Sequence, residues 1–195
     1  NWSIGIWYAN ATEPDACPFI TGYSIQDRFG CPDGDNDGWS NPDANWTAAN
    51  GADAFPENPT QWSDRDNDGW GDNQTEGALQ IDDFPDNPSQ WLDTDGDGWG
   101  DNQSYGASQV DDFPLIPSQY RDTDGDGYGD ELNGFQGDAC PSVIGNSTED
   151  RFGCTDSDGD GWSDDGDDLP SEPSQWKDRD GDGYGENTAG VNPDS

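Results

Sequence analysis

The sequence lacks histidine and methionine entirely, and only six of its 195 residues are lysine or arginine. The absence of histidine excludes a histidine-based catalytic or metal site. No apolar run approaches the roughly 18 residues of a membrane-spanning helix, so we expect no direct membrane insertion. Leucine, isoleucine, valine and phenylalanine together number 22, which is too few for the core of an ordinary enzyme, and we expect no catalytic activity.

Acidic residues are abundant instead, and the 44 aspartates and glutamates give a formal net charge of −38. Such a chain repels phosphate, which excludes nucleic acids as partners. Composition alone would predict disorder, but disordered acidic chains avoid aromatic residues, and this chain has 10 tryptophans. We therefore expect a chain that folds when multivalent cations neutralise its carboxylates.

A nine-residue motif occurs six times, with aspartate at positions 1, 3 and 5, glycine at position 6 and an aromatic residue at position 7. Chance does not repeat such a pattern six times, so we interpret its copies as metal sites and not as solvated acidic turns. We call them loops 1 to 6, and they occupy residues 33–41, 64–72, 93–101, 122–130, 156–164 and 178–186.

Calcium binds about six to eight oxygens, and acids at alternate positions of a tightly turned loop supply three of them. Magnesium requires a stricter octahedron and keeps its water, so calcium is the expected ion. The predicted side-chain ligands at positions 1, 3 and 5 are Asp33, Asp35, Asp37, Asp64, Asp66, Asp68, Asp93, Asp95, Asp97, Asp122, Asp124, Asp126, Asp156, Asp158, Asp160, Asp178, Asp180 and Asp182. The predicted backbone-carbonyl ligands at position 7 are Trp39, Trp70, Trp99, Tyr128, Trp162 and Tyr184. The predicted ligands at position 9, direct or through water, are Asp72, Asp101, Asp130, Asp164 and Glu186.

An EF-hand would close the coordination shell with glutamate at position 12, but no loop has glutamate there. The missing ligand must come from further along the chain, where a recurrent acid is the natural candidate. Each ion would then tie a loop to the segment that follows it. These acids, called block acids below, are Asp53, Asp82, Asp111, Asp138 and Asp167.

Four of the block acids open a second repeated segment, the aromatic–proline block, which reads DDFPDNPSQWLD from Asp82. Its aromatic residues fill a slot before proline (Phe55, Phe84, Phe113) and a slot after glutamine (Trp62, Trp91, Tyr120, Trp176). We favour the interpretation that these rings and those at position 7 pack as small local cores. The alternative is that they form exposed platforms for sugars.

The four cysteines lie in two copies of a longer repeat that are offset by 123 residues. Four cysteines permit three pairings, and the duplication favours the local one, Cys17 with Cys31 and Cys140 with Cys154. The alternative, a zinc site, needs close pairs such as CxxC, which are absent. Disulfides imply an oxidising compartment, so we expect an extracellular or cell-surface location.

The motifs DACP, DRFGC, DGDGWxD and DAFPxxPxQW resemble thrombospondin type 3 repeats, in particular variants from large secreted surface proteins of marine microorganisms. The resemblance covers nearly the whole chain. It implies aspartate-rich loops that wrap calcium ions, often more than one per repeat, and an extracellular structural or adhesive stalk. The aromatic–proline block and the scarcity of cysteine depart from that family, so a ladder of disulfides is not expected.

Six asparagines begin N-x-S/T acceptor sequences, and N-linked glycans on an exported protein are one interpretation of them. The other interpretation is that asparagine, serine and threonine are simply favoured turn residues. The six are Asn1, Asn10, Asn45, Asn73, Asn102 and Asn146.

Taken together, these patterns predict a mostly irregular fold, an extended calcium-stapled repeat rod with little regular helix or strand and with local disulfides. We expect an N-terminal partial repeat with a disulfide loop (1–32), calcium-loop repeats (33–137), and a second disulfide loop with further repeats that stops inside a repeat (138–195). The predicted function is a structural stalk, fibre or filament whose partners are copies of itself and covalent glycans. The alternatives are a calcium-dependent adhesin or carbohydrate-binding module with exposed tryptophans, and a spacer within a larger surface protein.

Overall fold

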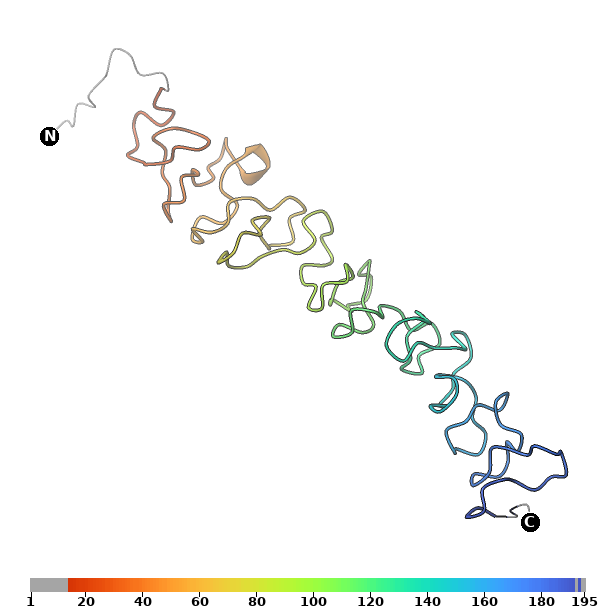
Figure 1. The fold of residues 1–195 in the computed structure, drawn as a ribbon. Helices are drawn as coiled ribbons and strands as arrows, with labels where there is room; N and C mark the ends of the chain where they lie inside the picture. Colours follow the sequence, from red (N-terminus) through yellow and green to blue (C-terminus); the bar gives the residue numbers. More distant parts are fainter. Residues whose placement is uncertain (1–13, 192, 194–195) are drawn as a thin grey trace. The chain divides into compact units, whose positions relative to one another are not determined.

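The computed structural model describes residues 14–191 and 193, and nearly all of them form turns, bends and irregular segments (Figure 1). Within this part of the chain the single helix is the 3-10 turn η1 (Ala48–Asn50), which ends at Gly51 with a φ of 104°. The β-structure of the same residues consists of three isolated parallel bridges, Gly71 with Ile81, Gly100 with Val110 and Gly185 with Pro193. The prediction of a mostly irregular fold is confirmed.

The chain divides into two compact units, Asn1–Leu92 and Asp93–Ser195. The first unit contains loops 1 and 2, and the second contains loops 3 to 6. Each unit also contains one disulfide, Cys17–Cys31 in the first and Cys140–Cys154 in the second, as predicted. No helix among the described residues has the length and apolar character needed to cross a membrane.

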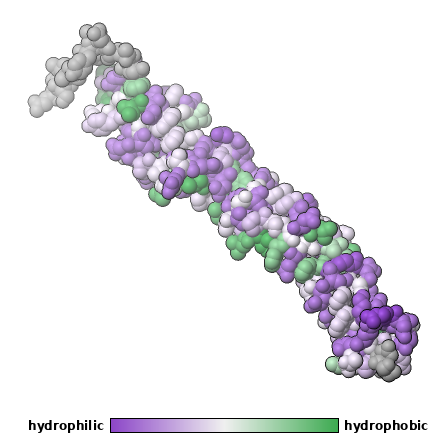
Figure 2. All heavy atoms as spheres, viewed as in Figure 1, coloured by the Kyte–Doolittle hydropathy of each residue, from purple (hydrophilic) through white to green (hydrophobic). Residues whose placement is uncertain are grey.

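The buried side chains are mostly polar, which is the reverse of an ordinary globular core. Among the described residues the buried hydrophobic positions are Cys31, Ala52 and Cys154. The largest fully buried side chains are instead glutamines and aspartates, and polar residues cover most of the visible surface (Figure 2). Stability must therefore come from hydrogen bonds and disulfides more than from apolar burial.

A buried glutamine organises each aromatic–proline block. Gln61 is fully buried, its Oε1 accepts the N–H of Asn73 at 2.9 Å, and its Nε2 donates to the carbonyls of Asn73 and Leu79 at 3.0 and 2.9 Å. Gln119, two blocks later, and Gln175, in the last block, make the same pattern of bonds. Because both ends of the carboxamide are satisfied, this polar side chain can replace an apolar core residue.

The aromatic rings stack in pairs between a loop and the block that follows it. Trp39 with Trp62 and Trp162 with Trp176 have ring centroids 6.2 Å apart and planes within 5° of parallel. The same slots pair Trp70 with Trp91 at 6.0 Å and Trp99 with Tyr120 at 4.4 Å. Each of these rings is half-buried, so packing between neighbouring segments is one role that the rings have.

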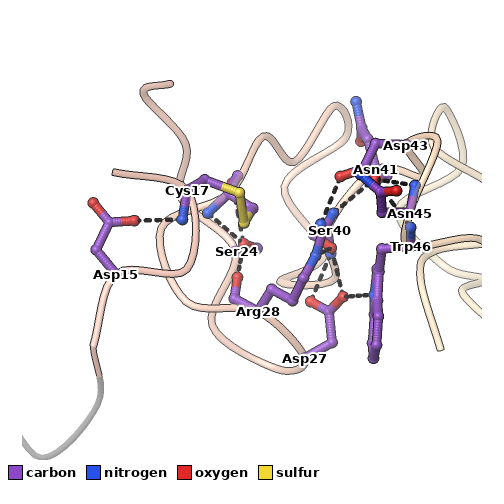
Figure 3. The surroundings of a disulfide bond; sticks show 11 residues. Asp15, Cys17, Ser24, Asp27, Arg28, Ser40, Asn41, Asp43, Asn45 and Trp46 are labelled. Atoms are coloured by element: carbon purple, nitrogen blue, oxygen red, sulfur yellow. Dashed lines mark hydrogen bonds and ion pairs between the residues drawn. A yellow bond between two sulfur atoms is a disulfide. The ribbon is translucent and has the colours of Figure 1, made fainter. Parts of the chain in front are cut away.

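In each disulfide segment, the aspartate of the Asp-Arg-Phe-Gly-Cys sequence forms hydrogen bonds with the loop that follows it. In the first, shown in Figure 3, the carboxylate of Asp27 accepts bonds from the N–H and hydroxyl of Ser40 and from the indole N–H of Trp46. Arg28 lies over the Trp46 ring at 5.5 Å and pairs with Asp43 at 2.6 Å. Asp150 and Ser163 repeat the contact of Asp27 with Ser40 in the second copy. Position 8 of loops 1 and 5 is thereby held in place.

Candidate metal centres

The first aspartate of each loop folds the backbone around itself. In loop 2, Asp64 accepts the N–H of Asn67 with one carboxylate oxygen at 2.7 Å and the N–H of Gly69 with the other at 3.0 Å. The corresponding bonds recur in all six loops. Position 6 has a φ between 88° and 102° in every loop, a conformation that glycine adopts without strain.

In loops 1, 2, 3 and 5 the aspartates at positions 3 and 5 each use only one carboxylate oxygen in a hydrogen bond. Asp66 Oδ1 accepts the N–H of Asp68 at 3.2 Å, and Asp68 Oδ1 accepts the N–H of Trp70 at 2.8 Å. Their Oδ2 atoms are buried and have no hydrogen-bond partner. In loops 1 to 5 one oxygen from each of positions 1, 3 and 5 lies within 4.8 Å of the other two. The alternating aspartates thus turn their oxygens toward one point.

A backbone hydrogen bond brings each block acid back to the loop that precedes it. The N–H of Asp82 donates to the carbonyl of Gly71, at position 8 of loop 2, at 2.9 Å. The same bond runs from the other block acids to the residue at position 8. These pairs are Asp53 with Ser40, Asp111 with Gly100, Asp138 with Gly129 and Asp167 with Ser163.

The block acids are buried, with at most 2% of the surface of Asp53, Asp82, Asp111 and Asp138 exposed and 7% of that of Asp167. Each uses Oδ1 to accept an N–H two residues further on, as Asp82 does from Phe84 at 2.7 Å. In the first four of them Oδ2 is buried and without a hydrogen-bond partner.

Loops 1, 2 and 3 therefore each gather three unpartnered, buried carboxylate oxygens. The residues that carry them are Asp35, Asp37 and Asp53 in loop 1, Asp66, Asp68 and Asp82 in loop 2, and Asp95, Asp97 and Asp111 in loop 3. Loop 4 contributes Asp124 and Asp138 and loop 5 contributes Asp158 and Asp160. In loop 4, Asp126 Oδ2 accepts the N–H of Gly145 at 2.9 Å.

The raised pKa values of the block acids show that their charged carboxylate forms are unfavourable when no metal ion is bound. Burial, together with repulsion from the loop aspartates, raises the pKa of Asp53 to about 7 and those of Asp82 and Asp111 to about 6. The pKa values of Asp138 and Asp167 are also raised by burial. In every case the repelling charges include acids of the preceding loop, so the block acid and that loop share one electrostatic site.

A buried carboxylate oxygen without a partner costs about 1 to 3 kcal/mol, and a protein is stable by only about 5 to 15 kcal/mol. The thirteen such oxygens among the residues that the structure describes are therefore incompatible with a stable fold unless something compensates their charge. Converging carboxylate oxygens, without nitrogen or sulfur donors, fit a hard divalent cation such as calcium. The observed donor set is thus suited to that ion.

The position-9 acids have a role that the sequence did not reveal. Both oxygens of Asp72 accept hydrogen bonds at the mouth of loop 2, from the Ser63 hydroxyl at 2.5 Å and the Arg65 N–H at 3.3 Å. Asp101, Asp130 and Asp164 accept in the same way from threonine or serine at position 2. In loop 6, Glu186 pairs with Arg179 at 3.1 Å. These acids close the loops, and ligation by them, like ligation by the position-7 carbonyls, stays a prediction.

Two glutamines that the sequence gave no reason to notice also shape the sites. Gln80 and Gln109 stand two residues before a block acid, with φ values of 56° and 55° in the left-handed region. Their side-chain amides donate to the carbonyls of Gly69 and Gly98, at position 6 of loops 2 and 3. The chain bends at each glutamine, and the hydrogen bond of its side chain holds that bend against the loop.

The acceptor asparagines fall into two groups. Asn45 and Asn146 are exposed, whereas Asn73 and Asn102 are half-buried. Asn73 donates from its side-chain amide to the carbonyl of Thr60 at 2.7 Å, and Asn187, which does not begin an acceptor sequence, makes the same bond to Ser174. An asparagine at this place thus has a structural role without a glycan. Asn1 and Asn10 lie outside the described residues.

No protein-family model matches this chain, and no curated protein matches it. The similarity to thrombospondin type 3 repeats therefore rests on the motifs themselves. What the structure adds is the repeated presence of aspartate triplets that could hold metal ions.

Proposed function

We propose that the protein is an extracellular calcium-binding structural protein, a stiff stalk, fibre or filament whose shape is fixed by bound ions. The observation that carries this proposal is the set of buried carboxylate oxygens without partners at loops 1 to 3, each set shared between a loop and its block acid. An ion at such a site joins two segments that are 18 or 20 residues apart in sequence. Repeated along the chain, such joins would substitute for the missing apolar core.

Calcium is favoured over magnesium because the sites offer more than carboxylates. Backbone carbonyls at position 7 and water would raise the coordination number above the octahedral six of magnesium. The irregular geometry also suits calcium, whose oxygen shell tolerates variation in angle and number. The two disulfides are compatible with an oxidising, extracellular location.

The structural role is supported over adhesion by the stacked rings. A sugar-binding platform needs bare aromatic faces, whereas the rings at position 7 and after glutamine stack on one another in loops 1, 2, 3 and 5. N-linked glycans at the exposed Asn45 and Asn146 belong to the proposal, and mass spectrometry of the native protein tests them.

Solution X-ray scattering of the full chain, with calcium and after passage over a chelating resin, tests the proposed function. We expect a stiff, elongated particle in calcium and an expanded flexible coil without it, with recovery on calcium addition. Magnesium at the same concentration is the control and should restore the profile only weakly. An unchanged profile after metal removal would refute the proposal.

A further inference from the structure

The ring of Phe55, in the slot before proline, does not belong to any of the stacked pairs. Within residues 14–191 and 193 it makes no contact with another ring, whereas the rings after glutamine stack on those at position 7. Phe55 is half-buried, so part of its ring reaches the surface. This aromatic surface is not used by the packing that the other rings share.

An open surface hollow of about 420 Å³ lies at this ring, and it is lined by Phe55, Pro56, Glu57, Asn58 and Gln80. Small-molecule sites have volumes of about 300 to 1,000 Å³ and combine apolar or aromatic surface with a few polar groups. Here the ring and the proline supply the apolar surface, and the other three residues supply one carboxylate and two carboxamides. The hollow therefore has the size and the composition of a small-molecule site.

Hydrogen bonds hold the two segments that line the hollow. The N–H of Asn58 donates to the carbonyl of Phe55 at 2.8 Å, which closes the turn of residues 55–58. Asn58 Nδ2 donates to the carbonyl of Leu79 at 3.4 Å and so joins this turn to the second segment. The side-chain amide of Gln80 donates to the carbonyl of Gly69. All of these residues belong to the first compact unit, so the site is formed within that unit.

The three polar side chains keep hydrogen-bonding capacity for a ligand. In the part of the chain that the structure describes, the exposed Glu57 carboxylate forms no hydrogen bond or ion pair, and Gln80 Oε1 accepts no hydrogen bond. Asn58 Nδ2 carries a second hydrogen besides the one that it donates to Leu79. A ligand in the hollow therefore meets two acceptor groups and one donor beside an aromatic ring.

These groups match the chemistry of a neutral sugar. A pyranose presents C–H groups on one face, and their partial positive charge is attracted to the negative face of an aromatic ring. Its hydroxyl groups both donate and accept hydrogen bonds, which suits a carboxylate and two carboxamides. The free carboxylate, on a chain with a net charge of −38, repels acidic sugars.

We propose that this hollow binds a neutral pyranose residue of a glycan. The C–H face of the sugar packs on the Phe55 ring, and its hydroxyl groups bond to the three polar side chains. The site adds a binding function to the structural role proposed above, and it uses none of the carboxylates assigned to calcium.

The other three aromatic–proline blocks, in chain order, each lack one of these features. In the second block the acid after proline, Asp86, pairs with Arg65 at 2.9 Å and is not free. In the third block the exposed Leu115 replaces that acid. In the fourth block Leu169 replaces the ring. We therefore expect a single sugar site, in the first block.

Saturation-transfer nuclear magnetic resonance of the full chain in calcium tests this site. The probes are the methyl glycosides of glucose, galactose, mannose and N-acetylglucosamine, with glucuronic acid and choline as charged comparisons. We expect transfer to the C–H groups of at least one neutral glycoside and to neither charged compound. The absence of transfer to all four glycosides, or equal transfer to choline or glucuronic acid, would overturn the proposal.

Two variants locate the binding. Phe55→Ala and Glu57→Leu should each lower the association constant of the bound glycoside about tenfold, through the lost ring contact and the lost charged acceptor. Phe113→Ala is the matched control, because Phe113 fills the same slot in the third block, and it should bind as the wild type does. Glu57 is exposed, so its substitution leaves the fold intact even if that of Phe55 does not. Wild-type affinity in both variants would refute the site.

Removal of N-linked glycans from the native protein distinguishes two sources of the sugar. If a glycan of the protein itself occupies the hollow, transfer to the added glycoside appears only after enzymatic deglycosylation. Equal transfer before and after this treatment assigns the site to a glycan of another molecule. Isothermal titration with calcium on the same samples separates this proposal from the proposed function, because full calcium binding without sugar binding refutes the sugar site alone.

Discussion

The side chain of Gln61 lies directly against the backbone of Gly71, so that a Cβ on residue 71 would come within 2.1 Å of Gln61 Oε1. The same approach recurs at Gly129 with Gln119 and at Gly185 with Gln175, each at 2.0 Å. Glycine at position 8 is therefore required by a buried side chain from another segment and not by its own φ. The buried glutamine and the loop are one packing unit.

Gly71→Ala should destabilise the protein by about 1 to 3 kcal/mol, since the added methyl group overpacks a filled site. Gln61→Ala should cost about 2 to 5 kcal/mol through the cavity and the lost hydrogen bonds. Urea unfolding of both single variants and the double variant in calcium measures the coupling. The double variant should be less destabilised than the sum, because the shortened side chain makes room for the methyl group. Strict additivity would show that the contact does not matter.

Asp82→Asn should remove one bound calcium ion and affect stability in opposite directions with and without metal. In calcium at about a hundred times its Kd, the loss of one site costs about 2.7 kcal/mol. Without metal, the neutral amide removes a buried charge that repels Asp66 and Asp68, so the variant should be more stable than the wild type. Isothermal titration with calcium measures the number of bound ions. Thermal unfolding with and without calcium measures the two changes in stability.

The matched control for that substitution is Asp86→Asn in the same block. The Asp86 side chain is 79% exposed and pairs only with the exposed Arg65, at 2.9 Å. A surface ion pair of this kind contributes at most about 1 kcal/mol. The control should keep the full number of ions, and the ligand assignment of Asp82 would be wrong if both variants lost the same amount of calcium.

Acidification should act in opposite directions on the metal-free and the calcium-loaded protein. The pKa of Asp53 is about 7 in the folded metal-free chain and 3.8 in the reference state, so the folded form binds more protons between these values. Its contribution to stability is therefore complete below about pH 3.8 and is lost as the pH rises through 7. Asp82 and Asp111 act in the same sense up to about pH 6.

In calcium the protons compete with the ion, so affinity should fall as the pH falls over the same range. Near-ultraviolet circular dichroism of the tryptophans, recorded from pH 8 to pH 4, reports both trends. Asp53→Asn should weaken the pH dependence of the metal-free protein. Parallel pH trends in the two conditions would contradict a shared proton and metal site.

The sequence alone predicted the loops, the block acids and the disulfide pairing, because each depends on residues at fixed spacing within a repeat. Asp82 could be linked to loop 2 by its recurrence, and the structure places it there. The role of Gln61 could not be predicted, because its partners are backbone groups 12 and 18 residues away in an irregular chain. Without helical or strand periodicity, no pattern indicates which distant carbonyl a side chain meets. The repetition of Pro-x-Gln was the one signal that could have drawn attention to it.

The two disulfides should stabilise the metal-free protein more visibly than the calcium-loaded one. Each closes a segment with 14 residues of separation, a constraint worth about 3 kcal/mol in the unfolded chain. Cys140→Ala with Cys154→Ala removes the bridge beside loop 4 and leaves Cys17–Cys31 as an internal reference. We expect a lower thermal midpoint in both conditions, with complete unfolding at room temperature only after metal removal. Calcium affinity at loop 4 should fall as well, because Asp138, two residues before Cys140, is the block acid beside that loop. Unchanged affinity in this double variant, measured by titration, would show that calcium alone is sufficient to hold Asp138 in place.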